Sequence, residues 1–189
     1  ACLFVSAQQA RWIALLATLV DLVLGIVLWV ASDQSPGAPE WQFVEGPSAI
    51  FGRFSWALGI DGIALMLIVL TVFLMPICIG ASWEAIEKRV SEYMAAFLLT
   101  ETLMIGVFAA QDIYLFYVFF EAGLIPMYLI IGIWGGAERI YASYKFFLYT
   151  LLGSVLMLIA MMWMTHDAGT TAIPTLMAYN FPAGAQNWL

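Results

Sequence analysis

Five separate runs of about 20 mostly apolar residues constrain this chain more than any other feature of its sequence. A helix needs about 20 such residues to cross the hydrocarbon core of a bilayer. The chain has 64% hydrophobic and only 10% charged residues among 189, which is more apolar surface than a soluble core could bury. The sequence therefore predicts an all-α fold, a polytopic transmembrane helix bundle with about five full spans. The predicted spans are residues 11–30, 62–81, 93–110, 113–134 and 140–164.

We expect a single transmembrane domain over residues 1–189, with two longer connections between spans. Residues 31–61 contain three prolines and several aromatic residues, and they predict an interfacial loop with a short hairpin that turns at Gly46-Pro47. Residues 165–186 are polar and include Pro174, and they predict a second surface loop on the same, non-cytoplasmic side. The chain begins inside an apolar run and ends on residues that resemble the opening of another span. We therefore expect it to be the N-terminal fragment of a longer protein.

Charged residues divide unequally between the two ends of the predicted bundle. When the spans alternate in direction, five of the six basic residues fall at one end. The other end has six acidic residues and Arg53 alone. Because short loops rich in Lys and Arg stay in the cytoplasm, we expect residues 84–92 to face the cytoplasm or the mitochondrial matrix. The net charge of −7 argues against a nucleic-acid partner, and membrane lipid is the expected surrounding.

Glu121 is the strongest candidate for chemistry, because a carboxylate inside hydrocarbon costs about 2.5–3.5 kcal/mol on insertion scales and persists mainly where it has a function. It lies eight residues into the fourth predicted span, or about 12 Å deep at 1.5 Å per residue. Pro126 removes the helical hydrogen bond to the carbonyl of Ala122, and Gly123 lets backbone or water approach. We interpret Glu121 as a wet proton-transfer site; the alternative is a structural ion pair or a protonated, hydrogen-bonded acid.

Two further acidic residues lie within predicted spans. Glu101, between two threonines, is either a second proton-carrying group or a neutral acid that links helices. Asp21 shares a helix face with Thr18 and Gly25, and small or polar residues at that spacing more often mark helix packing.

Lys145 lies five residues into the last predicted span, with tyrosines four residues away on both sides. It either extends to the membrane surface or acts as a base whose protonation is tuned by burial and a nearby carboxylate. The sequence predicts no metal site and no cofactor-binding motif, because it has no cysteine cluster for an iron–sulfur centre and no glycine-rich nucleotide loop.

Long segments of the chain resemble one known family. The runs FEAGLIPMYLIIGIWGG and RIYASYKFFLYTLLGSVLML, both within residues 112–164, are similar to the fifth and sixth helices of the chain M (subunit 4) family of proton-pumping NADH:quinone oxidoreductase, respiratory complex I. Upstream, GIDGIALMLIVLT resembles the family's third helix, and HDAGTTAIPTLMAYNFP resembles its bacterial-type loop before the seventh helix. The resemblance covers nearly the whole chain.

This resemblance implies an antiporter-like subunit of about fourteen helices that translocates protons, coupled to NADH oxidation and quinone reduction in other subunits. The family's fifth-helix glutamate matches Glu121, and its lysine partner would lie on the seventh helix, of which this sequence holds only the first residues. Lys145 matches a basic position of the sixth helix. NADH, FMN, iron–sulfur clusters and quinone are expected in partner subunits, which include other membrane-arm and related antiporter-like subunits.

Two other functions stay open from the residues alone. A subunit of a multisubunit cation/proton antiporter would share the helices and Glu121 but would depend on sodium rather than on NADH. A structural membrane scaffold would tolerate Glu121→Gln. The bacterial-type loops favour a bacterial inner (plasma) membrane, with the mitochondrial inner membrane as the alternative.

Overall fold

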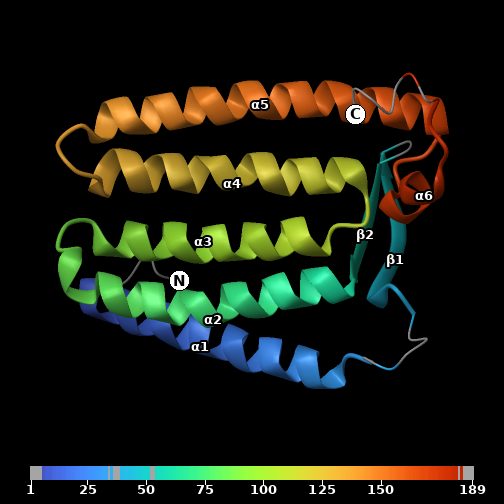
Figure 1. Cartoon of the computed structure of the whole chain (residues 1–189). Coiled ribbons are helices and arrows are strands. Elements are labelled where there is room, and N and C mark those ends of the chain that lie inside the picture. Colours follow the sequence, from blue (N-terminus) through green and yellow to red (C-terminus); the bar gives the residue numbers. More distant parts are fainter. Residues whose placement is uncertain (1–5, 34, 36–38, 52–53, 183, 185–189) are drawn as a thin grey trace.

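Five long helices lie side by side and alternate in direction, with a two-stranded hairpin and a short helix at one end (Figure 1). The structure is a computed structural model that describes residues 6–33, 35, 39–51, 54–182 and 184. In this part of the chain, five helices are long and apolar enough to cross a membrane. The predicted bundle of five apolar helices is therefore confirmed. The long helices are α1 (Ala7–Ala31), α2 (Gly62–Ala85), α3 (Val90–Ala109), α4 (Ile113–Trp134) and α5 (Arg139–Ala168).

Polar side chains at the helix starts explain where several helices begin. Ser6 and Gln9 form a reciprocal capping box, so α1 begins at Ala7, earlier than the predicted residue 11. The side chain of Asp61 accepts a hydrogen bond of 2.6 Å from the backbone N–H of Ala64 and caps α2. Asp112 caps α4 in the same way. Each cap satisfies backbone donors that the first turn leaves unpaired.

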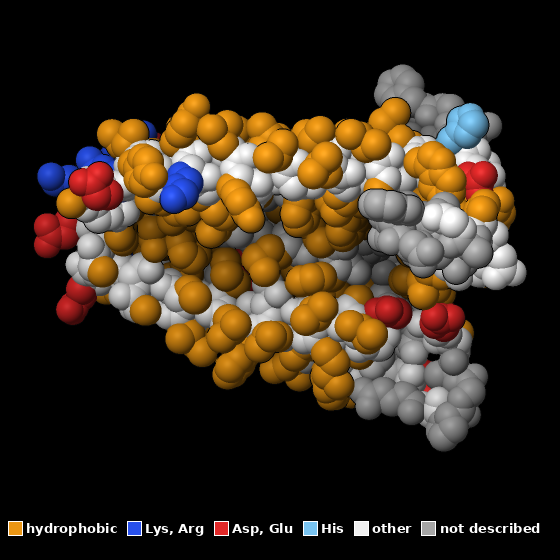
Figure 2. Space-filling view, turned by 45° about the horizontal axis from the view of Figure 1, so that its top comes forward, with side chains coloured by type: hydrophobic (Ala, Val, Ile, Leu, Met, Phe, Trp, Pro, Cys, Tyr) orange, Lys and Arg blue, Asp and Glu red, His pale blue; other side chains and the backbone are white. Residues whose placement is uncertain are grey.

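The helices pack as a cluster of three followed by a row. Ala14 of α1, Ile79 of α2 and Met94 of α3 belong to one buried cluster, together with Val90 and Tyr93. Helix α4 packs on α3, and α5 packs on α4. Apolar side chains cover the sides of the bundle, and most charged side chains gather at its two ends (Figure 2). Helix α3 is thus surrounded on more sides than α5.

The hairpin formed by β1 (Gln42–Phe51) and β2 (Phe54–Ile60) does not turn where the sequence suggested. The two strands pair as far as Phe51 and Phe54, well beyond Gly46-Pro47, and residues 52–53 between them lie outside the described residues. Gly46 and Pro47 lie within β1, where the register shifts between Glu45 and Ser48. Proline lacks a backbone donor, and in a strand it is tolerated at such an irregularity or at a sheet edge. The predicted Gly-Pro turn was therefore wrong.

The predicted loop over residues 165–186 is partly helical. Helix α5 continues to Ala168 and ends at Gly169, whose φ of 71° lies in the left-handed region that glycine adopts without strain. A short helix, α6 (Ile173–Ala178), follows, with Pro174 in its first turn. Proline fits there because the N–H it lacks would have no helical partner. The predicted surface loop therefore begins within the last turn of α5 and contains a short helix.

Candidate functional site

Glu121 lies on the side of α4 that faces α5. It lines a groove of about 390 Å³ with Tyr117, Ala122 and Ile125 of α4 and Phe147 of α5. Its Oε2 atom is buried and has no hydrogen-bond partner among the described residues. A carboxylate oxygen without a partner in an apolar groove is unfavourable unless water, a proton or a further group satisfies it. The surroundings therefore suit a carboxyl group that exchanges a proton.

The backbone beside Glu121 is open, as the sequence suggested. Pro126 is buried inside α4 and provides no N–H for the carbonyl of Ala122. A side-chain carbon added at Gly123 would meet no atom within 4 Å. The helix thus offers a carbonyl that lacks its usual helical donor, and open space, within one turn of the carboxyl group.

Glu101 occupies a much more enclosed place, on α3. Its side chain is 2% exposed, and neither carboxylate oxygen has a hydrogen-bond partner in the part of the chain that the structure describes. Two turns earlier on the same face of α3, Met94 packs in the cluster shared with α1 and α2. Glu101 therefore faces the three-helix side of the bundle.

Glu101 and Glu121 lie at the same depth but point to different sides. Glu101 is eight residues before the end of α3 and Glu121 eight residues after the start of α4, so each is about 12 Å from that end of the bundle. The two helices meet where Gly106 packs against the ring of Phe119. Two residues along a helix turn by about 200°, which directs Glu121 away from this contact. The structure thus keeps the two carboxyl groups apart.

Lys145 lies on the outer surface of α5. Its side chain is exposed, and its Nζ atom is 5.6 Å from the centre of the Tyr141 ring, a cation–π distance. Among the described residues, the structure records no ion pair between Lys145 and Glu121. Their arrangement does not form a lysine–glutamate pair within this chain.

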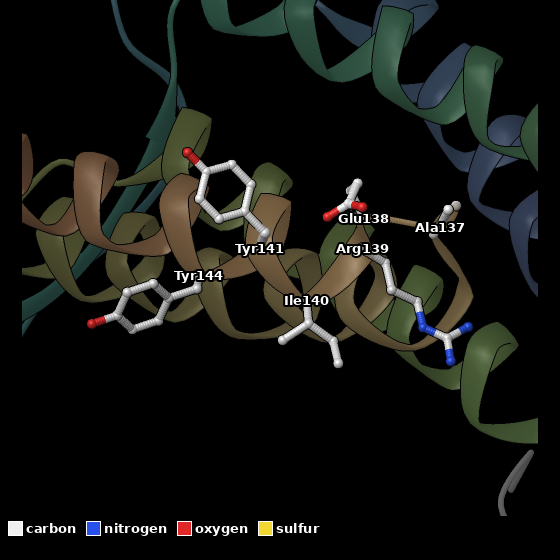
Figure 3. A pocket seen from close by; sticks show the side chains of 8 residues that line it. Ala137, Glu138, Arg139, Ile140, Tyr141 and Tyr144 are labelled. Atoms are coloured by element: carbon white, nitrogen blue, oxygen red, sulfur yellow. The ribbon is translucent and has the colours of Figure 1, made fainter.

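A hollow of about 830 Å³ lies at the turn between α4 and α5, and it is lined by none of Glu101, Glu121 and Lys145. Figure 3 shows that Glu138, Arg139, Tyr141 and Tyr144 extend from it in different directions. The described residues also contain no group of three His, Cys, Asp or Glu side chains that could hold a metal ion. The candidate chemistry therefore rests on isolated carboxyl groups inside the bundle.

Asp112 has a structural role that was not predicted from the sequence, where it was counted only as a charge between two spans. It is fully buried, and its Oδ1 atom accepts from the backbone N–H groups of Tyr114 and Leu115. Its Oδ2 atom accepts from the Ser55 hydroxyl at 3.0 Å and from the Thr171 hydroxyl at 2.6 Å. One carboxylate thus joins α4, β2 and the segment before α6. An aspartate directly before an apolar run is a typical helix cap, and this signal could have identified it.

Comparison with known families places nearly the whole chain. Residues 3–110 match the family described as NADH-ubiquinone oxidoreductase chain 4, amino terminus. The chain belongs to this family. Residues 110–189 match a second description, NADH:quinone oxidoreductase/Mrp antiporter, TM. The resemblance read from the sequence is therefore confirmed.

Curated relatives of this chain include proteins from a bacterium and from a plant. The chain is 57% identical over 175 residues to NADH-quinone oxidoreductase subunit M of Rhodobacter capsulatus, covering 93% of this chain and 33% of the relative. It is 45% identical over 181 residues to NADH-ubiquinone oxidoreductase chain 4 of Arabidopsis thaliana, covering 95% and 36%. The chain thus spans about a third of the length of the curated relatives it matches.

Two solved structures share the fold of this chain. A chain of respiratory complex I from Thermus thermophilus with bound NADH superposes with a TM-score of 0.77 at 31% identity, covering 94% of this chain and 37% of that one. A chain of the archaeal membrane-bound sulfane sulfur reductase matches with a TM-score of 0.71 at 19% identity, covering 90% and 26%, which shows a common fold. Together with its five apolar helices, these relatives make the chain part of a multi-pass membrane protein.

Proposed function

We propose that this chain is the N-terminal part of a membrane-arm subunit of complex I that translocates protons. Other subunits would oxidise NADH and reduce quinone, and they would carry FMN and the iron–sulfur clusters. The observation that carries the proposal is Glu121: its Oε2 atom is buried in the α4–α5 groove and has no partner among the residues that the structure describes. Membrane-embedded ionisable groups are functional by default, and a positioned carboxyl group is a natural proton carrier.

The roles of the other two candidates are secondary. Glu101, buried at the same depth, would be a further proton-holding group. Lys145 would be a weaker candidate because its side chain is exposed on α5 of this chain. The lysine that the family resemblance implies on the seventh helix would complete the Glu121 site.

The charge distribution supports an orientation for the bundle. The end with the α2–α3 and α4–α5 turns carries most of the basic residues, and it would face the cytoplasm. The hairpin and α6 would lie on the opposite side. The higher identity to the Rhodobacter relative, 57% against 45% for the Arabidopsis one, supports a bacterial inner membrane.

The test of this function is NADH-driven proton uptake by inverted membrane vesicles that carry Glu121→Gln in the full-length subunit. We expect uptake to fall at least about tenfold, because a positioned proton-transfer group typically contributes about 10²–10⁴-fold. Glu121→Asp keeps a titratable group and is the matched control, which we expect to retain much of the activity. NADH oxidation with an artificial acceptor checks assembly. Normal pumping by an assembled Glu121→Gln complex would refute the role of this carboxyl group.

A cation/proton antiporter subunit is the second candidate, because the description matched by residues 110–189 covers both classes. The two functions differ in their driving force. Proton movement that requires NADH supports complex I, whereas sodium-dependent proton movement without NADH would support the antiporter.

A further inference from the structure

Glu101 is a buried acid for which the proposed Glu121 site gives no explanation. The carboxyl group is 2% exposed, lies within a helix of the bundle, and has no described partner for either oxygen. An ionised carboxylate in such a place is strongly destabilised, so it requires a proton or a nearby group that shares one. A group that shares a proton with Glu101 must lie next to this carboxyl group.

Parallel packing of α1 and α3 brings Asp21 to the same level. The two helices run in the same direction (Figure 1), and Ala14 and Met94 belong to one packed cluster between them. Asp21 is seven residues after Ala14, and Glu101 is seven residues after Met94. Seven residues are close to two turns, so both acids lie about 10 Å beyond the cluster and on the faces that meet there.

The neighbours of Asp21 on α1 establish that this face is the packed one. Ala10, Ala14 and Thr18 are fully buried, and Gly25 lies against the side chain of Val72 on α2. Asp21 falls between Thr18 and Gly25 at helical spacings of three and four. The stripe that the sequence suggested as helix packing therefore carries an acid within the contact itself. Asp21 therefore faces the side of the bundle that holds Glu101.

Asp21 and Glu101 differ in their access to a hollow of about 420 Å³. Asp21 lines it, together with Val72 of α2 and Ile105, which is one turn beyond Glu101 on α3. The hollow continues along α1 to Ala31 and reaches Phe43 of the hairpin. Asp21 is half-buried at the edge of this hollow, whereas Glu101 is buried and does not line it. A proton could therefore reach the pair through Asp21.

We propose that Asp21 and Glu101 form a carboxyl pair that shares one proton between α1 and α3, separate from the Glu121 site. Two carboxylates close together inside a protein do not both ionise at low cost, and a single shared proton turns their repulsion into a hydrogen bond. Asp21 is the member that exchanges the proton with the hollow, and Glu101 is the member that retains it. The pair holds a proton at the same depth as Glu121 but on the opposite side of α3.

Other titratable groups on the helices around the pair have different contacts or positions. Arg11 of α1 donates to the carbonyl of Ile86, and Tyr93 of α3 bonds to Ser82 near the same end. Glu92 pairs with Arg89, and Tyr114 of α4 bonds to Thr165 at the other end. The remaining titratable side chains on α2 and α4 are Cys78, Glu84, Tyr117, Glu121 and Tyr128.

Infrared spectroscopy of the purified, complete complex tests the pair directly. A protonated carboxyl group gives a carbonyl stretch that an ionised one lacks, and the difference between wild type and Glu101→Gln isolates the band of Glu101. At neutral pH we expect such a band in the wild type. We expect Asp21→Asn to shift its frequency, because the partner that shares the proton is replaced. The double variant, Asp21→Asn with Glu101→Gln, lacks the Glu101 carboxyl group just as Glu101→Gln does. The two spectra should therefore agree where the Glu101 carbonyl band is expected.

Asp167→Asn is the matched control, because it removes an exposed aspartate from the end of α5. It should leave the Glu101 band unchanged. Two results would overturn the pair: the absence of any protonated band that depends on Glu101, or a Glu101 band that Asp21→Asn does not move.

This test is independent of the proposed function. It measures protonation rather than pumping, and Glu121→Gln should leave the Glu101 band in place. Loss of the pair with intact dependence of pumping on Glu121 would refute only this inference. A normal pair in a complex that pumps without Glu121 would refute only the proposed role of Glu121.

Discussion

At the scale of residues, the acids of the chain divide into those with several hydrogen-bond donors and those with none among the described residues. Asp112 accepts hydrogen bonds from backbone and hydroxyl donors on three segments, so both of its carboxylate oxygens have partners. Glu101 and Glu121 have buried oxygens without described partners. Because an unsatisfied buried acid is costly, these two positions are the ones where a proton can be gained or lost with least rearrangement.

Replacing Asp112 by alanine should loosen the hairpin end of the bundle. The change leaves buried donors of Ser55, Thr171 and the first turn of α4 without an acceptor, and each such group costs about 1–3 kcal/mol. We expect a clear fall in the melting temperature of the full-length subunit in detergent, followed by tryptophan fluorescence. Thr171→Val removes one of these bonds and should cost only about 1 kcal/mol. Equal melting of Asp112→Ala and wild type would contradict this role.

At the scale of elements, small residues determine how closely the helices approach. Gly106 of α3 lies against the ring of Phe119, and a methyl group there would stand 2.6 Å from the Cδ1 atom of that ring. Gly25 makes a similar approach to Val72 between α1 and α2. Helix association in a membrane depends on such close packing. Lipid tails are as apolar as the helix surfaces, so the hydrophobic effect does not bring the helices together.

Gly106→Ala should therefore destabilise the α3–α4 contact, by about 1–3 kcal/mol, as overpacking of a close contact does. Phe119→Leu should recover part of the loss when the two changes are combined, because it removes the ring that the new methyl group meets. Gly153→Ala is the matched control: its methyl group would meet no atom within 4 Å, and it should be neutral or slightly stabilising. Thermal melting of the four variants measures the coupling, and additive effects would argue against a direct contact.

The sequence predicted where the helices lie along the chain better than it predicted which helices pack against one another. Apolar runs of about 20 residues locate α2, α4 and α5 well because hydrocarbon thickness imposes that length. The hairpin turn was misplaced because Gly46-Pro47 has turn chemistry, yet strand pairing over residues 42–60 puts it in a bulge. The proposed pairing of Asp21 with Glu101 could not be predicted from the sequence, since hydropathy gives neither the rotation of a helix nor the helices that pack against it.

At the scale of the whole molecule, the charge asymmetry and the alternating helices define two opposite ends. The turns at residues 86–89 and 135–138 lie at one end, and the hairpin and α6 lie at the other (Figure 1). Glu101 and Glu121 are nearer to the hairpin end, about 12 Å from it. If the basic end faces the cytoplasm, protons reach both groups by a shorter path from the outer side of the membrane than from the cytoplasmic side.

This orientation predicts which surface cysteines react from which side of the membrane. In a full-length subunit freed of its other cysteines, Glu87→Cys lies in the α2–α3 turn and Asp167→Cys near the end of α5, and both parent side chains are exposed. A membrane-impermeant maleimide should label Asp167→Cys in right-side-out vesicles and Glu87→Cys only in inverted ones, because short basic loops stay in the cytoplasm. Labelling after detergent treatment shows that both thiols can react. The reverse pattern would place the hairpin in the cytoplasm, and the shorter path to Glu121 would then start there.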